Sequence, residues 1–286
     1  MSNFRLSWRN YVFTEDCTLA VTAGTVSAGS ADNLKTMRLS DKATIVDTVA
    51  SGDAVIELSY ELDSGAPGLP VGLIGLLNYT LSHDGATSVT WEVSIDGGAF
   101  VDISDLVWQR PNSNMPLHLW YFPTEDNIYE VVFRITATFS SAGTLMFAPG
   151  ALWVGPLWAT ADGMEATWSN SVTDAGRMGR SEGSQGFPRR KPKYRVYEGR
   201  AVHVPFEWAY GDENDDSILD IQQLQYYVGV TEPVVLFPRT LNASGAYSVH
   251  STHRLGVYGH FEDIGRIEHM GGDLYQWTQA RLAELL

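Results

Sequence analysis

The chain has 286 residues, of which 44% are hydrophobic and 19% are charged, and it contains 27 Gly and 12 Pro. This composition excludes disordered, collagen-like and coiled-coil proteins. The single cysteine, Cys17, excludes an intrachain disulfide and Cys-based metal or redox motifs. The net charge of −15 opposes general nucleic-acid binding. Apolar residues 145–159 are interrupted by Gly and Pro and the start lacks a signal-type apolar run, so we expect no membrane insertion.

The first 160 residues predict a succession of β-strands. Residues 55–62 alternate apolar and polar side chains with a period of two, which is typical of a strand with one buried face. Residues 89–95 alternate again, and Asp96-Gly97-Gly98 after them predicts a tight hairpin turn. Short strands between Gly, Pro, Asn and Asp are typical of a β-sandwich or jelly roll. Further strands are predicted at 70–77, 99–103, 131–139 and 152–157.

Gly, Ser, Arg and Pro replace large apolar residues between positions 161 and 193. An aperiodic stretch of this length is unusual inside a domain, so it predicts an arm or linker between domain 1–160 and domain 194–286. One helix is predicted in the second domain, capped by Asp215 or Asp216 and ended by Gly229. The remaining predicted strands lie at 200–210, 234–237, 247–261, 265–269 and 274–282.

The expected fold class is therefore mainly β. A jelly-roll β-sandwich domain comes first, and a second β-sandwich domain with one packed α-helix follows it.

Residues 177–200 contain eight basic and two acidic side chains, a charge of +6 within an acidic chain. Such a basic segment complements an acidic surface, and the nearest one belongs to a second copy of the same chain. A solvated basic loop without a partner is the alternative interpretation. The predicted subunit interface comprises Arg177, Arg180, Arg189, Arg190, Lys191, Lys193 and Arg195.

An aromatic cluster lies between two predicted strands of the first domain. Sugars are bound by aromatic faces and a few polar groups, so this cluster is a candidate carbohydrate-binding platform. Core packing or a subunit interface explains the same residues equally well. The candidate residues are Trp108, Arg110, His118, Trp120 and Tyr121.

No catalytic residues are predicted. Residues 179–183 match G-x-S-x-G, but the strand and helix that flank a nucleophile elbow are missing. Four histidines between His250 and His269 lack a spacing that would place them together, so we expect no metal and no other cofactor. The chain is not expected to be an enzyme.

Several segments of the first domain resemble the discoidin or galactose-binding-like jelly roll. They are the Asn33-Leu34 loop, the Glu57-Leu58 strand, the apolar strand Leu73 to Leu77 and the hairpin Val93-Ser94-Ile95-Asp96-Gly97. The resemblance covers about the first 160 residues. It implies a jelly-roll fold and does not by itself imply sugar binding.

The layout as a whole resembles structural proteins of long-tailed bacteriophage tails. In distal-tail and related proteins, a small β-sandwich flanked by a helix closes into a ring and a galactose-binding-like domain projects from it. That family usually places the ring domain first, whereas here the predicted jelly roll comes first. The resemblance implies a distal-tail or minor tail protein that forms a trimeric or hexameric ring and connects the tail tube to the tip or receptor-binding parts.

The same resemblance implies a location and a set of partners. The protein would be part of the virion tail, assembled in the host cytoplasm, and would contact copies of itself, other tail proteins and a host-surface glycan. Acidic residues could line a channel through which DNA passes without binding, namely Asp212, Glu213, Asp215 and Asp216. The alternative function is a carbohydrate-binding module or lectin-like protein that binds the host surface.

Overall fold

The computed structural model describes residues 4–63, 68–107, 117–124, 127–159, 165–174, 176–180, 186–189, 191, 193–211, 220–241, 244 and 246–285, with backbone only at 165, 177–180 and 186–189. The chain divides into two compact units. The first, which we call the terminal unit, comprises Met1–Trp8, Trp158–Ser244 and Leu255–Leu286. The second, the inserted unit, comprises Arg9–Leu157 and Gly245–Arg254. The predicted domain 1–160 is therefore divided, because Met1–Trp8 and Arg9–Leu157 belong to different units.

The inserted unit is a β-sandwich built from antiparallel sheets, as expected from the sequence. One sheet has the order β2 (Cys17–Ala23), β5 (Gly52–Leu62), β12 (Glu130–Phe139), β8 (Ala86–Ile95) and β9 (Val101–Asp102). The other has the order β10 (Leu117–Tyr121), β7 (Leu73–Ser82), β13 (Gly143–Ala148), β4 (Thr44–Val49) and β3 (Thr25–Ala28), with β14 (Ala151–Gly155) also paired to β7. Strands β4, β5, β7 and β8 alternate between the two sheets, and so do β9, β10, β12 and β13, as in a jelly roll.

Short elements complete the inserted unit. They are α1 (Tyr11–Thr14), α4 (Val249–Leu255), the 3₁₀ helices Ala31–Lys35 and Ser104–Leu106, and the paired strands β6 (Leu69–Pro70) and β11 (Asn127–Ile128). No helix in the described part of the chain is long and apolar enough to cross a membrane.

The core of the inserted unit follows from the two-residue period of its strands. Every second residue of β12 is buried, and the register sets Ile135 opposite Ile56 and Phe133 opposite Leu58. Each such side chain contributes roughly 1.5–3 kcal/mol by leaving water. The predicted hairpin is confirmed, because β8 pairs with β9 across a turn in which Asp96 has a φ of 50° and Gly97 a φ of 69°.

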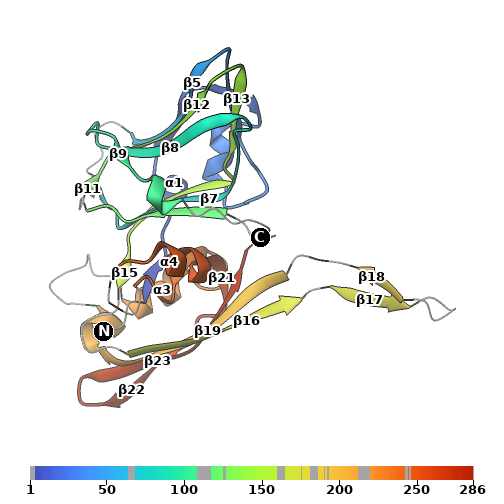
Figure 1. Cartoon of the computed structure of the whole chain (residues 1–286). Helices are drawn as coiled ribbons and strands as arrows, with labels where there is room; N and C mark the ends of the chain where they lie inside the picture. Colours follow the sequence, from blue (N-terminus) through green and yellow to red (C-terminus); the bar gives the residue numbers. More distant parts are fainter. Residues whose placement is uncertain are drawn as a thin grey trace. The chain divides into compact units, whose positions relative to one another are not determined.

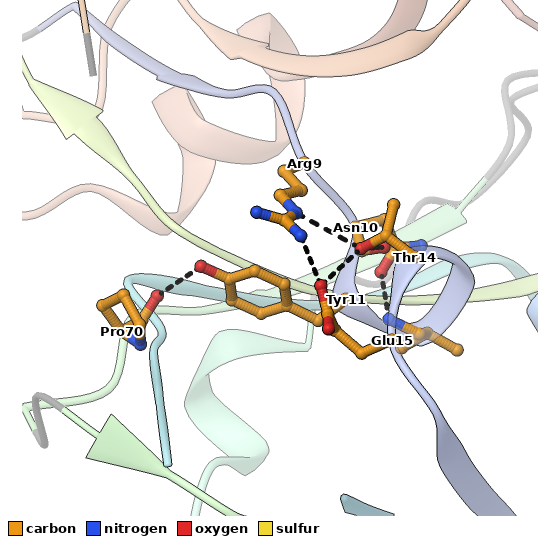
Figure 2. A network of polar contacts seen from close by, with 7 residues as sticks. Arg9, Asn10, Tyr11, Thr14, Glu15 and Pro70 are labelled. Carbon is orange, nitrogen blue, oxygen red and sulfur yellow. Dashed lines mark hydrogen bonds and ion pairs between the residues drawn. The ribbon is translucent and has the colours of Figure 1, made fainter. Parts of the chain in front are cut away.

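A buried amide fixes the start of the inserted unit. Asn10 caps α1 by accepting from the Val12 N–H at 3.2 Å, and it accepts from the Val154 N–H at 3.0 Å. Its Nδ2 donates to the Leu152 carbonyl at 2.9 Å. Around it, Arg9 forms a surface ion pair with Glu15, and Tyr11 donates to the Pro70 carbonyl (Figure 2). Asn10 thus ties α1 to β14, while the contacts of Arg9 lie at the surface.

The terminal unit is built on one antiparallel sheet. Its strand order is β15 (Trp158–Ala159), β1 (Arg5–Ser7), β20 (Pro233–Phe237), β21 (Val257–Asp263), β23 (Leu274–Glu284), β19 (Lys193–Pro205) and β16 (Glu165–Asp174), and β22 (Arg266–Gly271) also pairs with β23. Helices α2 (Phe206–Tyr210) and α3 (Ile221–Tyr227) belong to this unit. Its apolar core includes Leu6, Trp277 and Leu282.

Helix α3 is the predicted helix, but it starts later than expected. The Asp220 carboxylate caps it by accepting from the Gln223 N–H at 2.6 Å. Ile221, Leu224 and Val228 are buried. The predicted caps Asp215 and Asp216 lie outside the described residues.

Three other predictions for the terminal part of the chain need correction. The described part of residues 161–193 contains strands β16, β17 (Arg177–Arg180) and β18 (Gly186–Arg189) and the start of β19, rather than only an aperiodic linker. The predicted strand 200–210 ends at Pro205, which has no N–H for the ladder, and α2 follows. The predicted strand 247–261 is α4 followed by β21, because Ser248 Oγ accepts from the Ser251 N–H and starts a helix.

Candidate assembly surface

A long hairpin leaves the sheet of the terminal unit. Strand β16 pairs with β19 over ten residues, from Glu165 opposite Val202 to Asp174 opposite Lys193. Strand β23 supports β19 on its other side only from Val196 onward. Beyond that point the ribbon continues into β17 and β18, which pair with each other (Figure 1). Among the described residues, β17 and β18 have no other sheet partner.

Strand β16 forms an open edge of the sheet. In the described part of the chain it pairs with β19 only, so alternate backbone groups on its outer side have no strand to bond. None of the described side chains of β16 is buried, and Val172 is 67% exposed. Bulges, Pro and Lys normally protect an edge strand from pairing with another chain. Strand β16 has none of these, because its pairing with β19 is regular and its sequence lacks Pro and Lys.

A buried ion pair fixes the root of the hairpin. The Arg195 side chain donates to Glu284 Oε1 through Nε at 3.0 Å, to the Gly256 carbonyl at 2.9 Å and to the Tyr197 hydroxyl at 3.2 Å. Burial alone would lower the pKa of Arg195, but hydrogen bonding to Glu284 and its charge raise this pKa. The guanidinium is therefore charged and bound inside the unit, which corrects its prediction as an interface residue.

The other predicted interface residues belong to the outer part of the hairpin. Lys193 is exposed and pairs with Asp174 at 3.3 Å. Hydrogen bonding from the Gly176 N–H and then the Lys193 ammonium lower the pKa of Asp174. Lys191 is exposed as well.

For three of the remaining arginines of that set, the structure describes only the backbone. Arg177 and Arg180 belong to β17, and Arg189 belongs to β18 directly opposite Arg177. Arg190 lies outside the described residues.

An exposed aromatic patch that was not predicted from the sequence lies where β19 ends. We define the aromatic patch as Phe206, Tyr210, His269 and Tyr275. The ring of Tyr275 lies 6.0 Å from Phe206, 5.2 Å from Tyr210 and 5.1 Å from His269, measured between centroids. The i, i+4 spacing of Phe206 and Tyr210 after Pro205 is a helix signal that could have revealed it.

Two exposed acidic residues belong to the same segments as the aromatic patch. Glu207 is exposed on α2, and Asp273 is exposed in the turn between β22 and β23. Residues 205–220 contain six acidic side chains and no Lys or Arg. Four of these six, the predicted channel residues Asp212, Glu213, Asp215 and Asp216, lie outside the described residues.

The described part of the predicted carbohydrate platform is largely buried. Trp120 has no exposed surface, and its ring lies over Gly75 of the neighbouring strand, where an added Cβ would come within 2.8 Å. His118 is 5% exposed, and its Nδ1 accepts from the Asn78 N–H at 3.1 Å. A buried indole offers no face to a sugar, so His118 and Trp120 act in packing. Tyr121 is partly buried, and Trp108 and Arg110 lie outside the described residues.

The histidines differ in their exposure to solvent. His253 is buried in α4, whereas His250 and His269 are exposed. Within the part of the chain that the structure describes, no three His, Cys, Asp or Glu side chains gather where they could hold a metal ion.

Comparisons with known proteins add one distant likeness. The sequence matches no protein-family model and no curated protein. Among solved structures, the chain is similar to CBM32-3 from a family 31 glycoside hydrolase from Clostridium perfringens, with 12% sequence identity and a TM-score of 0.29. The likeness covers 49% of this chain and 90% of that chain. At this TM-score the likeness carries no argument about function.

Proposed function

We propose that the protein is a structural subunit of a bacteriophage tail, of the distal-tail or minor-tail type, that assembles with copies of itself into a ring. The observation that carries this proposal is the hairpin that extends from β16 and β19 into β17 and β18. A two-stranded hairpin is marginally stable by itself in water. A hairpin that leaves its own sheet is therefore best explained by a partner surface.

The order of the units along the chain also supports the proposal. Because β1 pairs with β15 and β20 in the terminal unit, the chain enters that unit before the jelly roll. The distal-tail proteins that this layout resembles usually place the ring domain first. Here the ring-type unit, with α3 in its core, is also entered first.

Charge fits a self-assembling subunit. The net charge of −15 keeps separate subunits soluble, while the basic hairpin complements the acidic remainder of a neighbouring copy. A head-to-tail contact of this kind closes into a ring when its rotation permits. The proposed role is located in the virion tail after assembly in the host cytoplasm, involves other tail proteins, and needs no catalysis or cofactor.

The alternative, a carbohydrate-binding module, requires an exposed aromatic face in the inserted unit. Its remaining candidates are Tyr121, Trp108 and Arg110. Glycan-array binding that is lost in Trp108→Ala, together with a monomeric protein, would favour this alternative.

The proposal is tested by measuring the mass of the purified protein in solution by light scattering after size exclusion, at low and moderate salt. We expect a closed oligomer of defined mass that dissociates as salt rises, because screening weakens contacts between opposite charges. Negative-stain electron microscopy should then show rings. A 31.5 kDa monomer at every protein concentration and salt would contradict the proposal.

A further inference from the structure

We propose that the aromatic patch is the docking surface for the β17–β18 hairpin of a second copy of the chain. This inference rests on the proposed self-assembly and names the two surfaces that meet. Both surfaces belong to the terminal unit.

The chemistry of the aromatic patch is that of an interface core. Phe206 is 45% exposed and Tyr210 37%, and both rings lie beside the ring of Tyr275. Aromatic residues are enriched where protein surfaces associate. A contiguous exposed apolar patch with a polar surround indicates an interaction site.

The hairpin of the terminal unit has the matching composition. Strands β17 and β18 contain Met178, Phe187 and Pro188 between arginines. The register sets Arg177 directly opposite Arg189, and the two strands together contain three arginines and no acidic residue, so the hairpin carries concentrated positive charge. The aromatic patch supplies apolar contact, and Glu207 and Asp273 on the same segments supply the negative charge.

The two surfaces lie at opposite ends of one strand. The hairpin continues from the Lys193 end of β19, whereas Pro205 at the other end pairs with Leu274 and leads into α2. Thirteen residues of β-strand span about 40 Å. The hairpin of one chain therefore points away from its own aromatic patch, and a contact between them joins two different copies.

This geometry defines a head-to-tail contact. Each copy uses its hairpin to contact one neighbour and its aromatic patch to contact the other. Every hairpin and every aromatic patch is therefore occupied once a ring closes. A symmetric dimer would instead use the same surface on both chains.

The test uses a patch variant, Phe206→Ser with Tyr210→Ser, and a hairpin variant, Arg177→Glu with Arg189→Glu. The matched control is Tyr226→Ser, which removes an 81% exposed aromatic ring of α3 outside the aromatic patch. We expect each test variant to weaken assembly at least about tenfold in dissociation constant, and the control to assemble like the parent chain. Circular dichroism and thermal unfolding establish that all variants are folded, and Glu207→Lys repeats the test by charge alone.

Mixing the patch and hairpin variants gives the decisive result. One functional hairpin and one functional patch remain in the mixture, so we expect complexes with the mass of two 31.5 kDa chains and no larger species. A parent chain that assembles, together with patch variants that assemble equally well, would overturn the docking surface and leave the proposed function intact. A parent chain that stays monomeric would overturn both.

Discussion

The inserted unit and the terminal unit treat their sheet edges in opposite ways. In the inserted unit the edge strands are short or irregular: β9 has two residues, β3 has four, and β2 contains a register shift. In the terminal unit β16 presents ten regular residues and leads into the hairpin. A long regular edge is a template for pairing with another chain. The difference supports a division in which the inserted unit is complete by itself and the terminal unit is completed by assembly.

The polar groups buried in the two units reflect the same division. Asn10 in the inserted unit joins a helix to a strand inside a closed sandwich. Arg195 and Glu284 in the terminal unit join the root of the hairpin to the last strand of the sheet. The first arrangement stabilises a core, and the second fixes the direction of a projecting element.

The largest expected effect comes from breaking the buried ion pair. Glu284→Ala leaves the Arg195 guanidinium buried without its carboxylate, which should lower the free energy of unfolding of the terminal unit by about 3–5 kcal/mol. Denaturant unfolding measures the loss, and hydrogen exchange should place it in β19 and β23.

The control for this pair replaces both partners. Arg195→Met with Glu284→Leu should recover most of the stability, because an apolar pair of similar volume needs no charge compensation. A loss below about 1 kcal/mol in Glu284→Ala would contradict the structural role of the pair.

The next effect concerns the inserted unit. Asn10→Ala removes the partners of the Leu152 carbonyl and the Val154 N–H and should cost about 2–3 kcal/mol. The matched control is Arg9→Ala in the same network, whose exposed ion pair should contribute less than about 1 kcal/mol (Figure 2). Equal losses in the two variants would show that Asn10 has no special role.

A smaller effect concerns Asp220 and pH. Burial raises the pKa of Asp220, so the folded chain binds its proton more readily than the unfolded chain. The stability that Asp220 contributes therefore falls as pH rises through the raised pKa. Asp220→Asn keeps a capping oxygen and should remove this loss, whereas Asp220→Ala should cost about 1 kcal/mol.

The measurement for Asp220 is the free energy of unfolding of the parent chain and of Asp220→Asn between about pH 4 and 7. We expect the difference between them to change in favour of Asn as pH rises. A difference that stays constant over this range would exclude a role for Asp220 protonation.

Local patterns in the sequence were sufficient for much of the fold. Alternation predicted β12, and the Asp96-Gly97 pair predicted the hairpin turn, because both depend on neighbouring residues. The helix around Leu224 was also predicted from its apolar stripe. Its start was misplaced because several aspartates precede it, and only the structure identifies Asp220 as the cap.

Features that depend on distant residues were not predictable. The sequence does not distinguish Arg195 from the other arginines of the basic segment, because its partner Glu284 lies 89 positions away. The aromatic patch joins α2 to β22 and β23, and their proximity follows only from the register of β19 with β23. Burial of Trp120 depends likewise on packing beside Gly75.

The central claim is that the hairpin beyond Asp174 and Lys193 is the assembly element. Because these two residues are directly opposite, replacing residues 175–192 by Asn-Gly closes the hairpin with a two-residue turn and leaves the sheet unchanged. The most direct measurement is the mass of this shortened chain beside the full chain, by light scattering at equal concentration. We predict a ring-sized oligomer for the full chain and a folded monomer for the shortened one. The same oligomer for both would contradict the claim.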